Sequence, residues 1–136
     1  MTTKSDIIAT ERLRASGLRV TNPRVLIYAF LIENNSHPTC DEIYSSLKDE
    51  EEGLSFASVY NVTQKLSEVG LVNELVTPDG QKHYDAQIKF HGHFFCNRCN
   101  SIFDFNCTKE LYEKQLGKHK LDSINVYAKG LCEKCI

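Results

Sequence analysis

The hydrophobic and polar positions of the first 70 residues predict a series of helices. Apolar residues recur at three- and four-residue steps, as they do on a helix face that packs against a core. Thr21 precedes an apolar run and can cap a second helix, while Thr39 and Glu42 have the spacing of a capping box for a third. The first helix is expected to end near Gly17 and to bury a face made of Ile7, Ile8, Ala15 and Leu18.

The segment 55–70, SFASVYNVTQKLSEVG, has the most regular helical pattern in the chain. Ser55 can cap this helix and Gly70 can end it. Its apolar face is predicted to contain Val59, Val62, Leu66 and Val69. The opposite face carries hydrogen-bonding side chains, namely Ser58, Tyr60, Asn61, Gln64 and Lys65. A face of this kind is typical of a helix that reads DNA, although a solvated helix of an ordinary helical domain would look similar.

Strand patterns follow the helices and complete two predicted domains. Two short strands flank a Pro-Asp-Gly turn at 78–80, so residues 1–85 resemble a winged helix-turn-helix domain. Residues 86–90 are predicted to form a hinge. Residues 91–136 alternate strand, helix and strand patterns, with Thr108 as a candidate helix cap. The predicted fold class is therefore α+β, with a DNA-binding domain and a small α/β domain.

Composition adds limits on location and partners. The 136 residues carry a net charge of −2, which by itself argues against a DNA-binding protein, but the placement of charges matters more than their sum. No apolar run reaches the roughly 18 residues of a membrane span, and the N-terminal segment lacks a signal-peptide pattern. We therefore expect a cytoplasmic protein without a membrane partner.

Four of the six cysteines form two CxxC pairs, Cys96/Cys99 and Cys132/Cys135. Four thiolates close the tetrahedral shell of a structural Zn²⁺, and a CxxC turn directs two sulfurs to one point. Asn100 follows the first pair, where a left-handed backbone is often needed, and Asn tolerates that conformation well. A redox dithiol and two unrelated cysteine pairs are the alternative interpretations. Cys40 and Cys107 are expected to be ordinary thiols.

His91 and His93 share one side of a predicted strand, which indicates a second, separate site. Asp104 lies on the following strand, and Asp85 and His37 are further nitrogen and oxygen donors. Such donors suit Fe²⁺ or Mn²⁺ better than thiolates do. From the residues alone, His83 and His119 are as remote as His37, and nothing internal selects among the three.

Several segments together resemble the ferric uptake regulator (Fur) superfamily, and most closely its peroxide-sensing PerR branch. They are TNPR (21–24), HPTCDEIY (37–44), SFASVYNVTQKLSEVGLV (55–72), HYD (83–85), HGHFFCNRCNSIFDF (91–105) and CEKC (132–135). Asp104 and Asn61 favour the peroxide branch, because iron-uptake regulators usually carry Glu and Arg there. Ser58 and Asn100 depart from the usual Thr and Gly without threatening the fold. Phe90 and Gly92 offer no ligands, so no third metal site is expected.

The resemblance implies a repressor, not an enzyme, that dimerises through its second domain and binds double-stranded DNA. It implies structural zinc at Cys96, Cys99, Cys132 and Cys135, and regulatory Fe²⁺ or Mn²⁺ at His37, Asp85, His91, His93 and Asp104. Peroxide would then be sensed by iron-catalysed oxidation of His37 or His91. The expected DNA contacts are Tyr60, Asn61, Gln64 and Lys65, with Arg14, Arg19 and Arg24 on phosphates.

Three other functions remain open at this point. A related repressor could sense iron, manganese or zinc itself. A small non-haem metalloenzyme could use two histidines and an aspartate to activate oxygen. A zinc-stabilised interaction module would leave the polar helix face unexplained.

Overall fold

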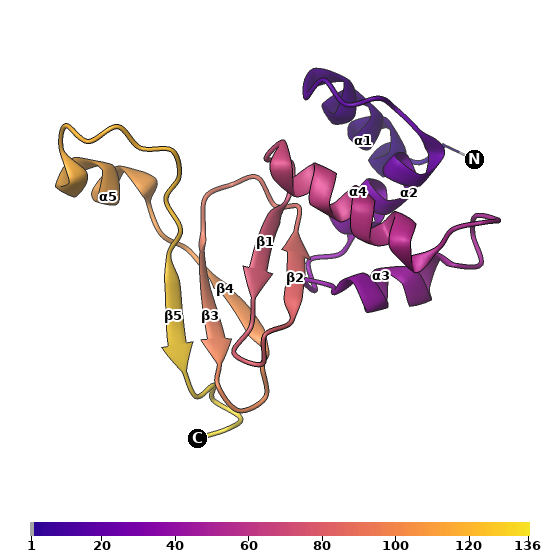
Figure 1. Cartoon of the computed structure of the whole chain (residues 1–136). Coiled ribbons are helices and arrows are strands. Elements are labelled where there is room, and N and C mark those ends of the chain that lie inside the picture. Colours follow the sequence, from indigo (N-terminus) through magenta and orange to yellow (C-terminus); the bar gives the residue numbers. More distant parts are fainter. Residues whose placement is uncertain (1) are drawn as a thin grey trace. The chain divides into compact units, whose positions relative to one another are not determined.

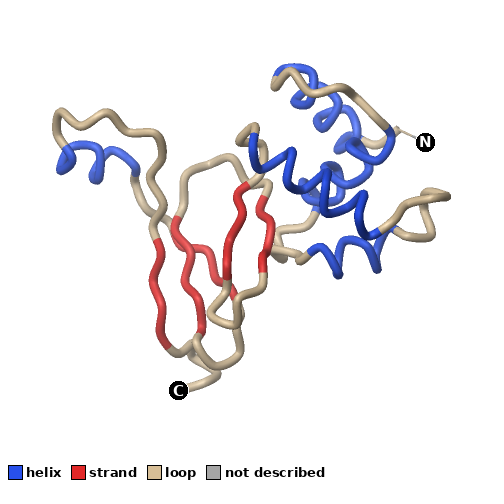
Figure 2. The backbone as a smooth tube through the Cα atoms, viewed as in Figure 1, coloured by secondary structure: helices blue, strands red, loops and turns tan. Residues whose placement is uncertain are grey.

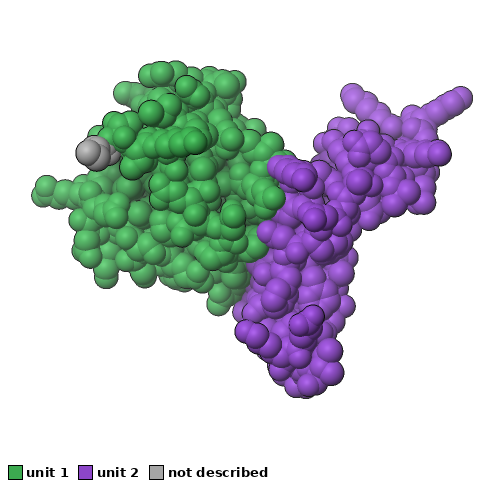
Figure 3. Space-filling view, turned by 180° about the vertical axis from the view of Figure 1, so that it is seen from behind, with its two compact units in different colours: residues 1–76, 81–88 green, residues 77–80, 89–136 purple. Residues whose placement is uncertain are grey.

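The computed structural model describes residues 2–136, which divide into two units. Unit 1 contains the residues up to 76 together with 81–88, and unit 2 contains 77–80 and 89–136 (Figure 3). The tip of the hairpin, residues 77–80, is assigned to the second unit, and the chain enters that unit for good between residues 88 and 89. The predicted domain ranges, 1–85 and 91–136 with a hinge between them, stay predictions. No helix within residues 2–136 is long and apolar enough to cross a membrane.

Unit 1 consists of a helical core followed by a hairpin, as the sequence predicts (Figure 1). The helices are α1 (Lys4–Ala15), α2 (Asn22–Glu33), α3 (Cys40–Leu47) and α4 (Phe56–Glu68). Strands β1 (Asn73–Val76) and β2 (Lys82–Asp85) pair antiparallel, with Asn73 opposite Asp85. The Pro-Asp-Gly turn joins them, and Gly80 supplies the positive φ of 87° that the turn requires.

Side-chain caps explain where most of these helices begin. Thr21 accepts a hydrogen bond from the N–H of Arg24, and Ser55 accepts one from the N–H of Ser58. Thr39 likewise accepts from the N–H of Glu42. The predicted reciprocal bond from the Glu42 side chain is absent among the bonds of residues 2–136, so the capping box is only half formed.

A complete capping box, unlike that of α3, begins the first helix, α1. Thr3 and Asp6 exchange both hydrogen bonds at the start of α1.

The buried residues of helix α1 are Ala9 and Leu13, whereas Ile7 is 51% exposed. Of the predicted face, Ile8 and Leu18 are half-buried and Leu18 packs against the core, but Ile7 and Ala15 are exposed. The prediction is therefore correct only in part, because the contact with α2 centres the buried side on Ala9 and Leu13.

Helix α4 confirms its predicted apolar face with one exception. Val59, Val62 and Leu66 are buried, but Val69 is 37% exposed since it caps the helix at its C-terminus. Thr63 is fully buried on the same side, which the apolar pattern does not predict.

Unit 2 is a three-stranded sheet with a short helix. Its elements are β3 (Gly92–Cys96), β4 (Ile102–Phe105), α5 (Lys109–Leu116) and β5 (Tyr127–Gly130). The strand order is β4-β3-β5, with β4 antiparallel and β5 parallel to the central β3. A long loop connects α5 to β5 (Figure 2). Thr108 occupies the N-cap of α5 but makes no side-chain capping bond.

Gly92 in β3 allows a close approach that a larger residue would prevent. A Cβ at this position would overlap the ring of Phe105 on the paired strand, whereas a Cβ at Gly130 would lie 3.6 Å from the Phe94 ring, in ordinary contact. We expect Gly92→Ala to lower the free energy of unfolding by about 1 kcal/mol, because the Phe105 ring must move away. Denaturant unfolding measures the loss, and Gly130→Ala is the control. Equal stability of the two variants would contradict the close contact.

Candidate metal centres

The four paired cysteines meet at one end of the sheet of unit 2. Cys96 ends β3 and Cys132 follows β5, and these strands run parallel as neighbours. The sulfurs of Cys96, Cys99, Cys132 and Cys135 all lie within 4.8 Å of one another. Sγ of Cys99 and Sγ of Cys132 are 3.8 Å apart. Sulfurs bound to one zinc at about 2.3 Å in a tetrahedron would be separated by about 3.8 Å. The donor set therefore fits a structural Zn²⁺.

Backbone turns hold the sulfurs in this arrangement. The N–H of Asn100 donates to the carbonyl of Cys96 at 3.0 Å, and Asn100 adopts the expected left-handed backbone with φ of 59°. A second turn forms where the N–H of Cys135 donates to the carbonyl of Cys132 at 2.9 Å. Nη1 of Arg98 donates to the carbonyl of Cys135 at 2.8 Å. This bond joins the two turns outside the sulfur cluster.

The surroundings of the sulfurs shift the pKa values of Cys96 and Cys135 in opposite directions. Backbone N–H groups of Cys99 and Cys132 point at Sγ of Cys96, at 3.5 and 3.4 Å. These donors stabilise the thiolate and lower the pKa of Cys96 to about 6. The neighbouring sulfur of Cys132 raises the pKa of Cys135 to about 12. A metal that binds all four sulfurs at neutral pH must therefore displace the Cys135 proton.

Two histidines and a carboxylate form a second group within unit 2. Asp104 lies opposite His93 in the β3–β4 register, and its Oδ1 is 3.4 Å from Nε2 of His93 and 3.6 Å from Nε2 of His91. Nδ1 of His91 lies 2.7 Å from the carbonyl of Lys89, which can only accept a hydrogen bond. Nδ1 thus donates to this carbonyl, and Nε2 is the nitrogen that faces Asp104. We name these three residues the His91 set.

A third group, His37 and Asp85, lies within unit 1. Nε2 of His37 is 3.7 Å from Oδ2 of Asp85, and both side chains are buried. His37 has a φ of 55°, a left-handed conformation that costs a residue with a Cβ about 1–2 kcal/mol. Nδ1 of His83 donates to the carbonyl of His37 at 2.7 Å and holds this backbone. We name His37 and Asp85 the His37 set.

His83 therefore contacts the backbone of the His37 set, and sequence reasoning left its role open. His119 is exposed in the loop after α5 and, among residues 2–136, belongs to neither the cysteine group nor these sets. Cys40 lies 3.4 Å from the hydroxyl of Thr63 and also stands outside the sulfur cluster. Both sets offer nitrogen and oxygen donors, which suit Fe²⁺ or Mn²⁺. The His37 φ is the feature that no sequence pattern predicted.

The polar face of α4 carries the expected DNA-binding side chains. Tyr60, Asn61 and Lys65 are exposed, and Gln64 is half-buried. With Arg24 they line a shallow hollow of about 400 Å³. Nη1 of Arg24 donates to the carbonyl of Arg19 at 2.8 Å, and Arg14 is exposed at the end of α1. The face thus offers amides, a phenol and cations, the groups that contact bases and phosphates.

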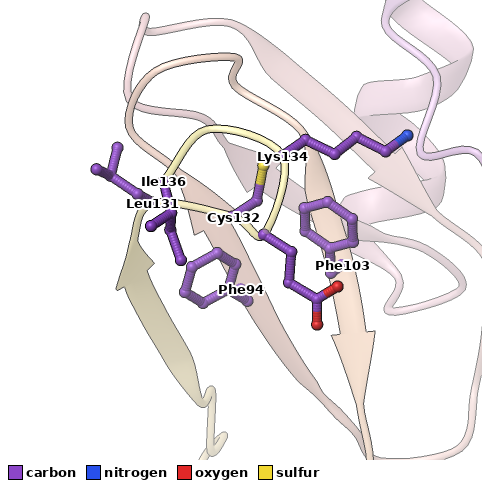
Figure 4. Close-up of a pocket in the computed structure, with 7 residues that line it drawn as sticks. Phe94, Phe103, Leu131, Cys132, Lys134 and Ile136 are labelled. Carbon is purple, nitrogen blue, oxygen red and sulfur yellow. The ribbon is translucent and has the colours of Figure 1, made fainter.

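A second hollow, of about 390 Å³, lies beside Cys132 on unit 2 (Figure 4). Phe94, Phe103, Leu131 and Ile136 are the apolar residues of its lining. Phe103, Leu131 and Ile136 are exposed, so unit 2 presents an apolar surface here. Exposed apolar residues gathered in one place are typical of a surface that binds another protein.

The family model described as the ferric uptake regulator family matches residues 15–128. This chain belongs to the ferric uptake regulator family. The peroxide-responsive repressor PerR of Staphylococcus epidermidis is 33% identical over 129 residues, which cover 90% of this chain and 85% of that protein.

Solved structures of the family have the same fold. The ferric uptake regulator Fur of Helicobacter pylori, a protein with three functional metal binding sites, matches with a TM-score of 0.78 and 25% identity over 98% of this chain and 95% of that one. PerR of Streptococcus pyogenes, a protein of peroxide sensing and gene regulation, matches with a TM-score of 0.56 and 28% identity over 100% and 96% of the chains. The predicted winged-helix and α/β fold class is thereby confirmed.

Replacement of one sulfur should test the cysteine cluster. We expect Cys96→Ser to lose the bound zinc and to unfold unit 2, because three thiolates and a hydroxyl hold zinc far less tightly. Metal analysis of the purified protein and circular dichroism measure the two effects. Cys107→Ser is the matched control, since this thiol lies outside the cluster. Full zinc occupancy in the Cys96 variant would exclude this site.

Proposed function

We propose that the chain is a metal-dependent repressor that binds double-stranded operator DNA as a homodimer and is inactivated by hydrogen peroxide. The observation that carries the proposal is the His91 set, in which Asp104 lies within 3.6 Å of two histidines and apart from the four cysteines. The likeness to peroxide-responsive repressors of staphylococci supports it. The cytoplasm is the compartment we propose, because unpaired thiols persist in reducing surroundings.

The two kinds of donor are assigned different tasks. Cys96, Cys99, Cys132 and Cys135 hold structural Zn²⁺, and four thiolates leave no open position for chemistry. His37, Asp85, His91, His93 and Asp104 hold regulatory Fe²⁺ or Mn²⁺. The His37 set supplies two side chains and the His91 set three, and a metal usually takes four to six ligands. One ion bound by both sets would join the units in one orientation and raise the population of the DNA-binding state.

Peroxide acts on the ligands rather than on a separate substrate. When bound, Fe²⁺ supplies the reduction of hydrogen peroxide that leads to oxidation of an adjacent histidine ring. The Lys89 carbonyl engages Nδ1 of His91 and leaves Nε2 as the nitrogen that can bind a metal, and His37 is held beside Asp85. An oxidised ring at either residue is a poorer ligand, so the two sets separate and the protein leaves DNA. The protein consumes its own side chain and does not turn over.

DNA recognition is assigned to unit 1 and dimerisation to unit 2. Tyr60, Asn61, Gln64 and Lys65 would contact bases from α4, and Arg14, Arg19 and Arg24 would contact phosphates. The apolar hollow at Phe94 and Phe103 and the edge strand β5 suit a second copy of the chain. A dimer would place two copies of α4 about one helical turn apart on the duplex.

A repressor that senses iron, manganese or zinc itself is the second candidate. The higher TM-score with the Helicobacter pylori Fur favours it, at 0.78 against 0.56 for the Streptococcus pyogenes PerR. Asp104 and Asn61 favour the peroxide branch, on the resemblance described above. The two candidates differ in one property, the response of the metal-loaded protein to peroxide.

Peroxide should release the iron-loaded protein from its DNA. The protein is loaded with Fe²⁺ without oxygen, bound to a duplex selected from random sequences, and treated with hydrogen peroxide. We expect loss of the complex in a gel and a mass gain of one oxygen atom on the peptide of His37 or His91. The Mn²⁺-loaded protein treated in the same way is the comparison. A complex that persists with unmodified histidines would favour direct metal sensing.

Loss of His37 should weaken both metal and DNA binding. We expect His37→Ala to bind Mn²⁺ at least about tenfold more weakly and to need correspondingly more Mn²⁺ for DNA binding. Zinc content should not change, since the cysteines are intact. Calorimetry and DNA titration measure the effects, and His119→Ala is the control. Normal Mn²⁺-dependent DNA binding by the His37 variant would refute a metal that joins the two sets.

A further inference from the structure

Tyr84 connects two parts of unit 1 to which the proposed function gives different tasks. Its side chain is 1% exposed, and it directly precedes Asp85 in β2. Its backbone N–H donates to the carbonyl of Pro38 at 3.0 Å, next to His37. Its hydroxyl accepts a hydrogen bond from Nε2 of Gln64 on α4, also at 3.0 Å. One residue therefore contacts both the backbone that follows His37 and the polar face of α4.

Side chains alternate along β2, so the two sides of the strand face different parts of unit 1. His83 and Asp85 lie on one side of the strand and Tyr84 on the other. The first side faces His37, through the His83 bond to its carbonyl at 2.7 Å and through Asp85 at 3.7 Å. The second side faces α4 through the Tyr84 ring. A movement of β2 at Asp85 consequently moves the hydroxyl that Gln64 contacts.

Gln64 needs such a contact if it is to read a base. A glutamine recognises adenine through both atoms of its carboxamide, which requires a fixed orientation. Its side chain has three rotatable bonds and loses considerable entropy when it is fixed. The Tyr84 hydroxyl fixes one amide N–H in advance, and the carboxamide oxygen and the other N–H can then face the DNA.

We propose that Tyr84 is a positioning residue that holds Gln64 in its base-reading orientation and transmits to it the state of the His37 set. This inference rests on the proposed function and goes beyond it, since it assigns the route by which metal reaches the recognition helix. When a bound metal orders Asp85, the position of β2 is fixed. The strand then fixes the position of the Tyr84 hydroxyl, and the hydroxyl fixes the orientation of the Gln64 side chain.

The variant Tyr84→Phe keeps the packed ring and removes the hydroxyl, which contacts Gln64 and also the side chains of Thr63 and Cys40. Thr63, which is fully buried beside Tyr84, donates its hydroxyl to the carbonyl of Tyr60 at 2.9 Å and so keeps a partner. Gln64 is half-buried, so its amide can reach water. Tyr28→Phe is the matched control, because the equally buried Tyr28 hydroxyl has no hydrogen-bond partner within residues 2–136.

The test uses the full-length, zinc-containing protein, Mn²⁺, and a duplex selected from random sequences by the unmodified protein. We expect the gain in affinity for this duplex on addition of Mn²⁺ to fall about fivefold in Tyr84→Phe, the effect of one hydrogen bond. Coupling between two binding sites is reciprocal. The increase in Mn²⁺ affinity that the duplex causes should therefore also be about fivefold smaller in Tyr84→Phe. The Mn²⁺ affinity of the free protein and its binding to random duplex should not change.

A double-mutant cycle with Gln64→Ala separates this route from simple packing. If Tyr84 acts through Gln64, the double variant binds the selected duplex no more weakly than Gln64→Ala alone. Additive losses, equal losses on selected and random duplexes, or an unchanged Mn²⁺ gain in Tyr84→Phe would each overturn the inference and leave the proposed function intact. An unmodified protein without any Mn²⁺-dependent DNA binding would overturn both.

Discussion

The convergence of four cysteine sulfurs is the constraint on which unit 2 depends. Within residues 89–136, the buried hydrophobic side chains are only those of Phe95, Cys96 and Cys132, and α5 buries none of its residues. Unit 1, by contrast, buries apolar residues from all four of its helices. A segment with so little core needs a metal, a disulfide or a partner to stay folded. Zinc at the cysteines would supply that free energy directly, because the site does not exist in the unfolded chain.

The same strand places the proposed sensing residues on a rigid support. Gly92, Phe94 and Cys96 lie on one side of β3, and His93 lies on the other. The turn after Cys96 fixes the end of the strand, so the pairing of His93 with Asp104 is fixed as well. A ligand set needs such support, because small displacements change metal affinity. Structural and regulatory donors can thus share one strand without sharing a metal.

Much of this arrangement could be predicted from sequence, because it depends on local patterns. Both hairpins, the CxxC turns, the left-handed Asn100 and the pairing of Asp104 beside the His91 strand follow from alternation and turn chemistry. The buried face of α1 did not follow, since Ile7 and Ile8 are as apolar as the buried Ala9 and Leu13. Only the tertiary contact with α2 decides between them.

The candidate sites show the same limit. Spacing separated the cysteines from His91 and His93, but it could not choose among His37, His83 and His119. The structure distinguishes them through long-range contacts, namely Asp85 beside the His37 ring and His83 on the His37 carbonyl. The bond between Gln64 and Tyr84 joins residues 20 positions apart and has no signature in either segment.

The choice of histidine rather than cysteine as the proposed target of peroxide follows from where the sulfurs lie. Reactive cysteines are accessible thiolates, and Cys96 has the lowered pKa that would otherwise mark one. Its sulfur is buried, however, and a zinc shell would engage the lone pairs of all four clustered sulfurs. Cys40 is half-buried against the Thr63 hydroxyl. Oxidation by bound iron needs no thiolate, because the metal brings the reaction to its own ligands. Damage would then fall on His37 or His91, at the residues that hold the regulatory metal, while the zinc that maintains the fold is spared.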